Sequence, residues 1–193
     1  MTFLIFDLDA KGHHLEYIHH LYSYGGIHLV GHRIVFVLHP DFKNMYNFRT
    51  FCPQEHIDII YLKEEEVANL SSYSFKSAYK ASCLLKKYIN LVIPDTVFLN
   101  TIISFMPFLP IMVRNSRFIS GIEYTIPDRR IRASNRKKIE DHLKLFLYAY
   151  APCFKKIYLL NDSKYPIVYN KKFRVNKFSF LPDPYVPIYS VEE

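Results

Sequence analysis

Short apolar runs alternate with helical patterns along nearly the whole chain. The first run passes through two aspartates into a glycine and then directly into a helical pattern. Later runs are rich in β-branched and aromatic residues and are bounded by turn-forming residues, which is typical of strands. The predicted strands cover residues 2–8, 33–39, 57–62, 96–100, 117–124 and 157–160, with a last stretch ending at Phe180 and Leu181.

Helical spacing fills the segments between these strands. Residues 64–90 begin with acidic residues and continue with apolar residues at helical spacing and lysines between them, which predicts one or two amphipathic helices. Asp162 and Ser163 are predicted to cap a late helix. A long helix with a basic first half is predicted over residues 132–150, from the spacing of Ile139, Leu143, Phe146, Leu147 and Tyr150.

The order of these elements predicts the fold class. Parallel strands need crossover connections, so strands that alternate with helices favour a parallel sheet. We therefore predict an α/β fold with a doubly wound, mostly parallel sheet flanked by helices on both faces. At 193 residues and 50% hydrophobic residues, the chain has enough apolar material to bury a substantial core.

Membrane-spanning and secreted classes are not expected. The longest apolar stretch, residues 97–113, is interrupted by Asn100, Pro107 and Pro110 and is shorter than the roughly 20 residues of a spanning helix. We expect it to form a buried strand and helix. The amino terminus lacks a positive segment and reaches acidic residues early, unlike a signal peptide. A cytoplasmic protein is the expectation, and widely spaced Cys52, Cys83 and Cys153 suggest neither disulfides nor a zinc ribbon.

The net charge of +7 favours an anionic partner, which could be a phosphate-bearing ligand, an acidic membrane or a nucleic acid. We do not expect a nucleic acid, because no motif of a nucleic-acid-binding module is present. The densest basic run comprises Arg129, Arg130, Arg132, Arg136, Lys137 and Lys138. Such a run is often only a solvated face. Here it follows a strand end, so we expect it to contact an anionic lipid surface or a lipid-linked pyrophosphate acceptor.

The turn after the first strand holds the leading candidates for a site. Gly12 lets the chain turn from strand to helix, which brings backbone N–H groups and polar side chains to the carboxyl edge of the sheet. His13 and His14 in this turn could donate a hydrogen bond to a phosphate or act as a general base. Glu16 could contact an acceptor hydroxyl or simply interact with the helix amino terminus.

Two further observations concern metals and a second strand end. Seven of the nine histidines precede Pro40, but their spacing matches no compact metal-ligand pattern, so we expect surface histidines and no metal. Glu123 and Tyr124 end a later strand and are expected to line the same crevice. The alternative role of Glu123 is an ion pair with Arg129 or Arg130.

The order of strands and motifs resembles the amino-terminal half of a GT-B glycosyltransferase, of the family 4 type. The matching pieces are the Gly12-His13-His14 turn, the segment Gly121-Ile122-Glu123-Tyr124 followed by Pro127 and Arg129-Arg130, and the terminal segment Phe180-Leu181-Pro182-Asp183-Pro184-Tyr185. The resemblance implies a Rossmann-like acceptor-side domain over residues 1–181. It also implies a hinge over residues 182–193 that leads to a missing donor-binding domain.

The resemblance implies an enzyme that acts in polysaccharide or glycoconjugate synthesis and needs that second domain for transfer. The expected partners are a sugar or lipid-linked acceptor and a nucleotide-sugar donor, with no tightly bound cofactor. His13, His14 and Glu123 are the expected catalytic residues. Acceptor or phosphate binding is expected at Gly12, Glu16, Tyr124, Arg129 and Arg130. Family 4 members often carry a histidine where this chain has Glu123-Tyr124, so the resemblance leaves a retaining or inverting outcome open.

Two alternatives come from the same residues. Phe6-Asp7-Leu8-Asp9 resembles the first motif of haloacid-dehalogenase-type phosphohydrolases, in which one aspartate attacks phosphorus with the help of Mg²⁺. Ala10-Lys11 departs from that motif, and no second acidic residue follows Asp162 closely. The other alternative is an α/β binding module without catalysis.

Overall fold

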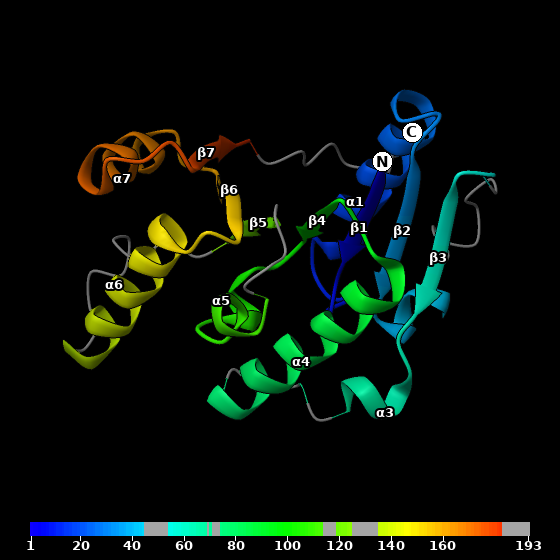
Figure 1. Ribbon diagram of the computed structural model, residues 1–193, viewed down its shortest axis with the longest axis horizontal. Helices are drawn as coiled ribbons and strands as arrows, with labels where there is room; N and C mark the ends of the chain where they lie inside the picture. The colour runs from blue at the N-terminus through cyan, green and yellow to red at the C-terminus, as the bar shows by residue number, and fades with distance from the viewer. Residues whose placement is uncertain (45–53, 69, 71–73, 114–118, 125–134, 183–193) are drawn as a thin grey trace, which may run out of the picture.

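The fold alternates strands and helices as the sequence predicts. The computed structural model describes residues 1–44, 54–68, 70, 74–113, 119–124 and 135–182, of which 135–138 are described by backbone only. The strands are β1 (Thr2–Phe6), β2 (Arg33–Leu38), β3 (Ile57–Tyr61), β4 (Thr96–Leu99), β5 (Ile119–Glu123), β6 (Phe154–Leu160) and β7 (Phe178–Leu181) (Figure 1). The helices are α1 (His14–His28), α3 (Glu64–Val67), α4 (Phe75–Val92), α5 (Leu109–Met112), α6 (Asn135–Tyr150) and α7 (Lys164–Phe173), with 3₁₀ turns η1 (Pro40–Asn44) and η2 (Ile103–Phe105).

These strands form one seven-stranded sheet in which every neighbouring pair is parallel. The strand order is β3-β2-β1-β4-β5-β6-β7. The chain moves outward from β1 to β3, returns to β4 on the other side of β1, and then continues to β7. This order confirms the predicted doubly wound, Rossmann-like α/β fold. The reversal between β1 and β4 is a topological switch point, where open α/β sheets bind ligands.

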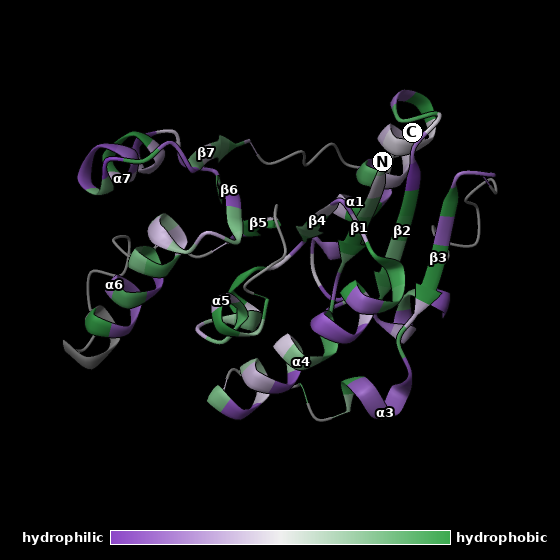
Figure 2. Cartoon of the chain, viewed as in Figure 1, coloured by the Kyte–Doolittle hydropathy of each residue, from purple (hydrophilic) through white to green (hydrophobic). Residues whose placement is uncertain are grey.

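Two apolar layers cover the faces of the sheet. Leu4 and Phe6 of β1 face one layer, into which α4, η2, α5, α6 and α7 contribute buried side chains. Ile5 faces the other layer, which it shares with Ile18 of α1 and with residues of β2, β3 and η1. This alternation follows from the two-residue period of a strand. Figure 2 colours much of β2 and β3 green, toward the hydrophobic end of the scale.

The predicted 97–113 stretch is confirmed as buried strand and helix, because it forms β4, η2 and α5 with Leu99, Ile102 and Leu109 fully buried. In the parts of the chain that the structure describes, no helix has both the length and the hydropathy to cross a bilayer. The predicted cap before α7 is also confirmed: Asp162 Oδ1 accepts the backbone N–H groups of Lys164 and Tyr165 at 2.8 and 3.0 Å.

Element boundaries differ from the prediction by a few residues. The sixth strand begins at Phe154 rather than at residue 157. The long helix is described from Asn135 onward, and the predicted residues 132–134 lie outside the described part of the chain. The spacing that predicted this helix does not mark its buried face. Ile139, Leu143, Phe146 and Tyr150 are exposed, whereas Leu147 is partly buried against the core. The buried apolar residues are Leu145, Tyr148 and Ala149, and Asp141 is buried as well.

A substitution at Gly121 of β5 tests how closely β5 packs against β4 beside the switch point. A Cβ atom there would lie 2.9 Å from the Leu99 carbonyl oxygen and 3.1 Å from the side chain of Ile102. We expect Gly121→Ala to lower the free energy of unfolding by about 1–3 kcal/mol, because backbone and a packed core side chain would have to move. Urea unfolding followed by circular dichroism measures the change.

Gly26→Ala is the matched control. Gly26 lies in α1, and a Cβ there would meet only the Gln54 side chain, at 3.3 Å. Alanine in a helix interior is more favourable than glycine by about 0.5–1 kcal/mol, so this variant should be neutral or more stable. Equal stability of the two variants would contradict the close approach of β5 to β4.

Candidate functional site

Polar side chains gather at the switch point, where the carboxyl ends of β1, β4 and β5 meet the start of α1. Asp7 follows β1, Asn100 and Thr101 follow β4, and Tyr124 follows β5. His14 is the first residue of α1. These residues are far apart in the sequence. They meet because β1, β4 and β5 are adjacent parallel strands whose carboxyl ends lie at one edge of the sheet.

The turn after β1 is shaped by its two aspartates. Asp7 Oδ1 accepts the backbone N–H of Asp9 at 3.1 Å, and Asp9 Oδ1 accepts that of Lys11 at 3.0 Å. Side chains that bond their own backbone two residues on stabilise tight turns. Gly12 then adopts φ +63°, in the left-handed region that favours glycine. The turn delivers His14 back over the end of β1.

A buried Asp7–His14 pair forms the centre of the site. The Asp7 side chain is completely buried, and its Oδ1 and Oδ2 each lie 2.9 Å from His14 Nδ1. Asn100 Nδ2 also donates to Asp7 Oδ2. Because an ionised carboxylate only accepts hydrogen bonds, we assign the proton to His14 Nδ1. Nε2 is then the ring atom available for proton transfer, 3.3 Å from Thr101 Oγ1.

The surroundings shift the acid–base balance of His14. Burial of the ring acts to lower the pKa of His14. The hydrogen bond to Asp7 and the negative charges of Asp7 and Asp9 outweigh burial, so the pKa is raised above the ordinary 6.5. His14 is therefore a stronger base than a free histidine, and Asp7 stabilises the ring once it carries a second proton.

Two tyrosines fix the orientation of the imidazole. The Tyr124 ring stacks on His14 with centroids 5.6 Å apart and planes at 14°. Tyr17 meets Tyr124 edge-on at 5.8 Å. The Tyr124 hydroxyl donates to Asn100 Oδ1 at 3.4 Å, which also orients the amide that binds Asp7. A ring held by hydrogen bonds on one edge and by stacking on one face has little freedom to rotate.

Glu123 lies on the opposite face of β5 from Tyr124. Its side chain is buried and accepts the Tyr148 hydroxyl of α6 at 2.7 Å. Burial, together with the carboxylates of Glu123 and Asp141, raises the pKa of Tyr148 well above its ordinary value. Adjacent residues of a strand face opposite sides, so the structure joins Tyr124 to His14 but directs Glu123 toward α6. Its predicted alternative partners, Arg129 and Arg130, lie outside the described residues.

The remaining predicted residues surround the turn. His13 is exposed, and its Nδ1 lies 3.1 Å from Glu16 Oε2 in the first turn of α1. Gly12 has open space where a Cβ would project, so its backbone can be approached closely. The structure thus separates the two neighbouring histidines: His14 is paired with a buried carboxylate, and His13 with a partly exposed one.

Sequence reasoning missed several members of the site. Asn100, Thr101 and Tyr17 were not among the predicted site residues, although Asn100 ends a predicted strand beside the first one. Asp7 was considered as a phosphohydrolase nucleophile. Its carboxylate is buried and accepts bonds from Asp9, His14 and Asn100, which suits an orienting group better than a nucleophile. Among the described residues, no cluster of three or more His, Cys, Asp or Glu could hold a metal ion.

Comparison with models of known protein families gives no match, and comparison with curated protein sequences gives none either.

The raised pKa of His14 can be measured directly. We expect His14 in the wild-type chain to titrate above 6.5 in imidazole ¹⁵N NMR spectra, and Asp7→Asn to lower this pKa, because it removes the negative charge beside Nδ1. The raised pKa also determines how the stability of the fold depends on pH. A raised pKa in the folded state stabilises the fold below pH 6.5, and this contribution is lost as the pH rises through the raised value.

Asp58→Asn is the matched control, because it also removes one carboxylate. Asp58 is half-exposed and pairs with Arg33 on β2. It should leave the His14 titration unchanged. A wild-type His14 that titrates at or below 6.5 would contradict the assigned Asp7–His14 pair.

Proposed function

We propose that this chain is the acceptor-side half of a nucleotide-sugar-dependent glycosyltransferase, with His14 as its general base. The observation that carries the proposal is the buried Asp7–His14 pair at the switch point of a doubly wound sheet. The pair leaves one basic nitrogen, His14 Nε2, available for proton transfer at the edge where such sheets bind ligands.

The proposed step is a proton abstraction coupled to glycosyl transfer. An acceptor hydroxyl gives its proton to His14 Nε2 as its oxygen forms a bond to the anomeric carbon of the donor sugar. The bond from that carbon to the donor phosphate breaks, and the nucleoside diphosphate leaves with the bonding electrons. Asp7 stabilises the resulting imidazolium, which is the reason for placing a carboxylate at Nδ1. A single displacement of this kind inverts the anomeric configuration.

The turn around Gly12 supports a phosphate on the donor side. Its backbone can be approached closely, and it leads into the amino terminus of α1, where first-turn N–H groups and the helix dipole favour an anion. In this proposal the rest of the donor is bound by a second Rossmann-like unit, and no cofactor is tightly bound. The reaction belongs to polysaccharide or glycoconjugate assembly from cytoplasmic nucleotide sugars.

Histidine variants test the proposal in the polypeptide as its source cells make it. Transfer is measured as the incorporation of radiolabel from a panel of nucleotide sugars into cell-envelope and extract fractions. We expect His14→Ala to reduce the rate by about 100-fold or more, the usual contribution of a general base. Wild-type kcat/KM should rise with pH and level off above the raised pKa of His14, because Nε2 must be unprotonated.

His28→Ala is the control, since His28 is an exposed residue in the last turn of the same helix. It should transfer sugar at the wild-type rate. Loss of transfer in His13→Ala together with full activity in His14→Ala would contradict the proposal, because it would identify His13 as the base. Mg²⁺-dependent hydrolysis of phosphate esters that Asp7→Asn abolishes would replace the proposal with the phosphohydrolase alternative.

A further inference from the structure

Helix α6 carries apolar residues on two opposite faces. Leu145, Tyr148 and Ala149 are buried against the sheet. The opposite face exposes large apolar side chains at spacings of four, three and four residues, which is a continuous stripe along a helix. We call this the outer stripe. Its members are Ile139, Leu143, Phe146 and Tyr150, which are 70%, 51%, 49% and 52% exposed.

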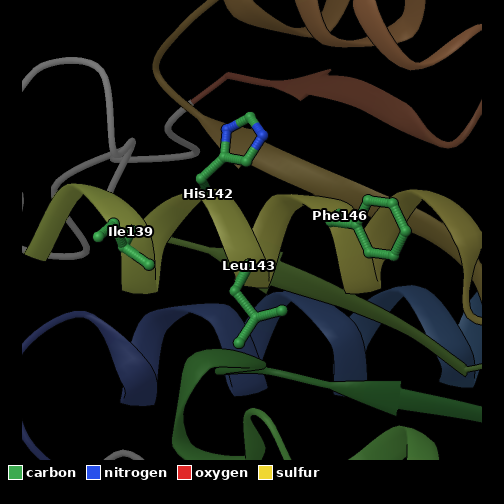
Figure 3. Close-up of a pocket in the computed structure, with 4 residues that line it drawn as sticks. All are labelled: Ile139, His142, Leu143 and Phe146. Atoms are coloured by element: carbon green, nitrogen blue, oxygen red, sulfur yellow. The ribbon is translucent and has the colours of Figure 1, made fainter. Parts of the chain in front are cut away.

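The outer stripe forms one surface rather than four isolated residues. The rings of Phe146 and Tyr150 lie 4.8 Å apart between centroids. Ile139, Leu143 and Phe146, with His142, line an open and almost wholly apolar depression (Figure 3). Green, hydrophobic segments recur along α6 in Figure 2. Contiguous exposed apolar surface of this kind marks a binding surface in soluble domains.

Basic residues outnumber acidic residues on the same helix. Arg136, Lys137 and Lys138 occupy its first turn, and three further arginines precede it within residues 129–132. Of its two acidic residues, Asp141 is buried and has Lys144 Nζ at 3.8 Å. Arg136, Lys137 and Lys138 therefore lie in the helical turn that directly precedes Ile139, the first residue of the outer stripe.

We propose that the outer stripe of α6 docks onto an anionic lipid bilayer, with the helix lying in the plane of the membrane interface. An amphipathic helix with basic residues beside an exposed Phe and Leu face binds such interfaces by apolar burial and by attraction to anionic lipids. A second copy of this chain is disfavoured as the occupant, because two chains of charge +7 would bring their basic runs together.

The proposal does not depend on glycosyl transfer. Membrane docking rests on α6, and the proposed chemistry rests on the Asp7–His14 pair, so either can fail alone.

Vesicle sedimentation of the whole chain tests the docking. We expect the wild-type chain to sediment with vesicles of phosphatidylcholine and phosphatidylglycerol and to remain in the supernatant with phosphatidylcholine alone. The double variant Leu143→Ser, Phe146→Ser should bind the anionic vesicles roughly tenfold or more weakly, because it removes apolar groups from the interface. The triple variant Arg136→Gln, Lys137→Gln, Lys138→Gln should lose at least as much.

Two control variants match these changes elsewhere on the surface. Ile27→Ser, Leu91→Ser removes two exposed apolar side chains from α1 and α4, and Lys76→Gln, Lys86→Gln, Lys171→Gln removes three exposed charges. Both should sediment like the wild type, and circular dichroism should show that all variants fold. Equal sedimentation with neutral and anionic vesicles, or no effect of either α6 variant, would overturn the proposal. Dimerisation in analytical ultracentrifugation that the Leu143→Ser, Phe146→Ser variant abolishes would also overturn it, in favour of a second copy.

Discussion

A carboxylate removed from water must be fully hydrogen-bonded, and in this fold that requirement falls on Asp7. Its partners are the backbone N–H of Asp9, the ring of His14 and the amide of Asn100. They fix, respectively, the turn after β1, the start of α1 and the residue that follows β4. One buried carboxylate thus specifies the local structure of the switch point, because losing any partner would leave it short of a hydrogen bond in a site closed to water.

The same constraint sets the chemistry that the site can perform. Burial alone would make His14 a weaker base, and the adjacent carboxylates reverse that effect. Tyr124 holds the ring by stacking and also orients Asn100, so the aromatic contact and the hydrogen-bond network support one another. The structural role of Asp7 and its proposed role in orienting a base are therefore one interaction. Helix α6, on the other layer, contributes its buried face to the core and leaves its apolar outer face for a partner.

The sequence predicted the fold well because strands here are short apolar runs with clear boundaries. The carboxyl-edge rule also located the turn at Gly12 to His14 correctly. The rule could not tell which of Glu123 and Tyr124 faces His14. Adjacent residues along a strand face opposite sides, and the pattern does not say which side holds the site. The sequence also did not reveal which face of α6 is buried. Its apolar residues lie on both sides, so spacing identified a helix without identifying what it packs against. The link between Asp7 and Asn100 spans 93 residues and has no local signal.

That long link has a consequence for how the site assembles. Strands β1 and β2 and helix α1 are close in sequence and can associate early, whereas β4 must cross nearly half the chain to lie beside β1. His14 is only seven residues from Asp7, whereas the amide of Asn100 reaches Asp7 only through the pairing of β4 with β1. The complete set of partners around Asp7 therefore exists only once β4 has paired with β1.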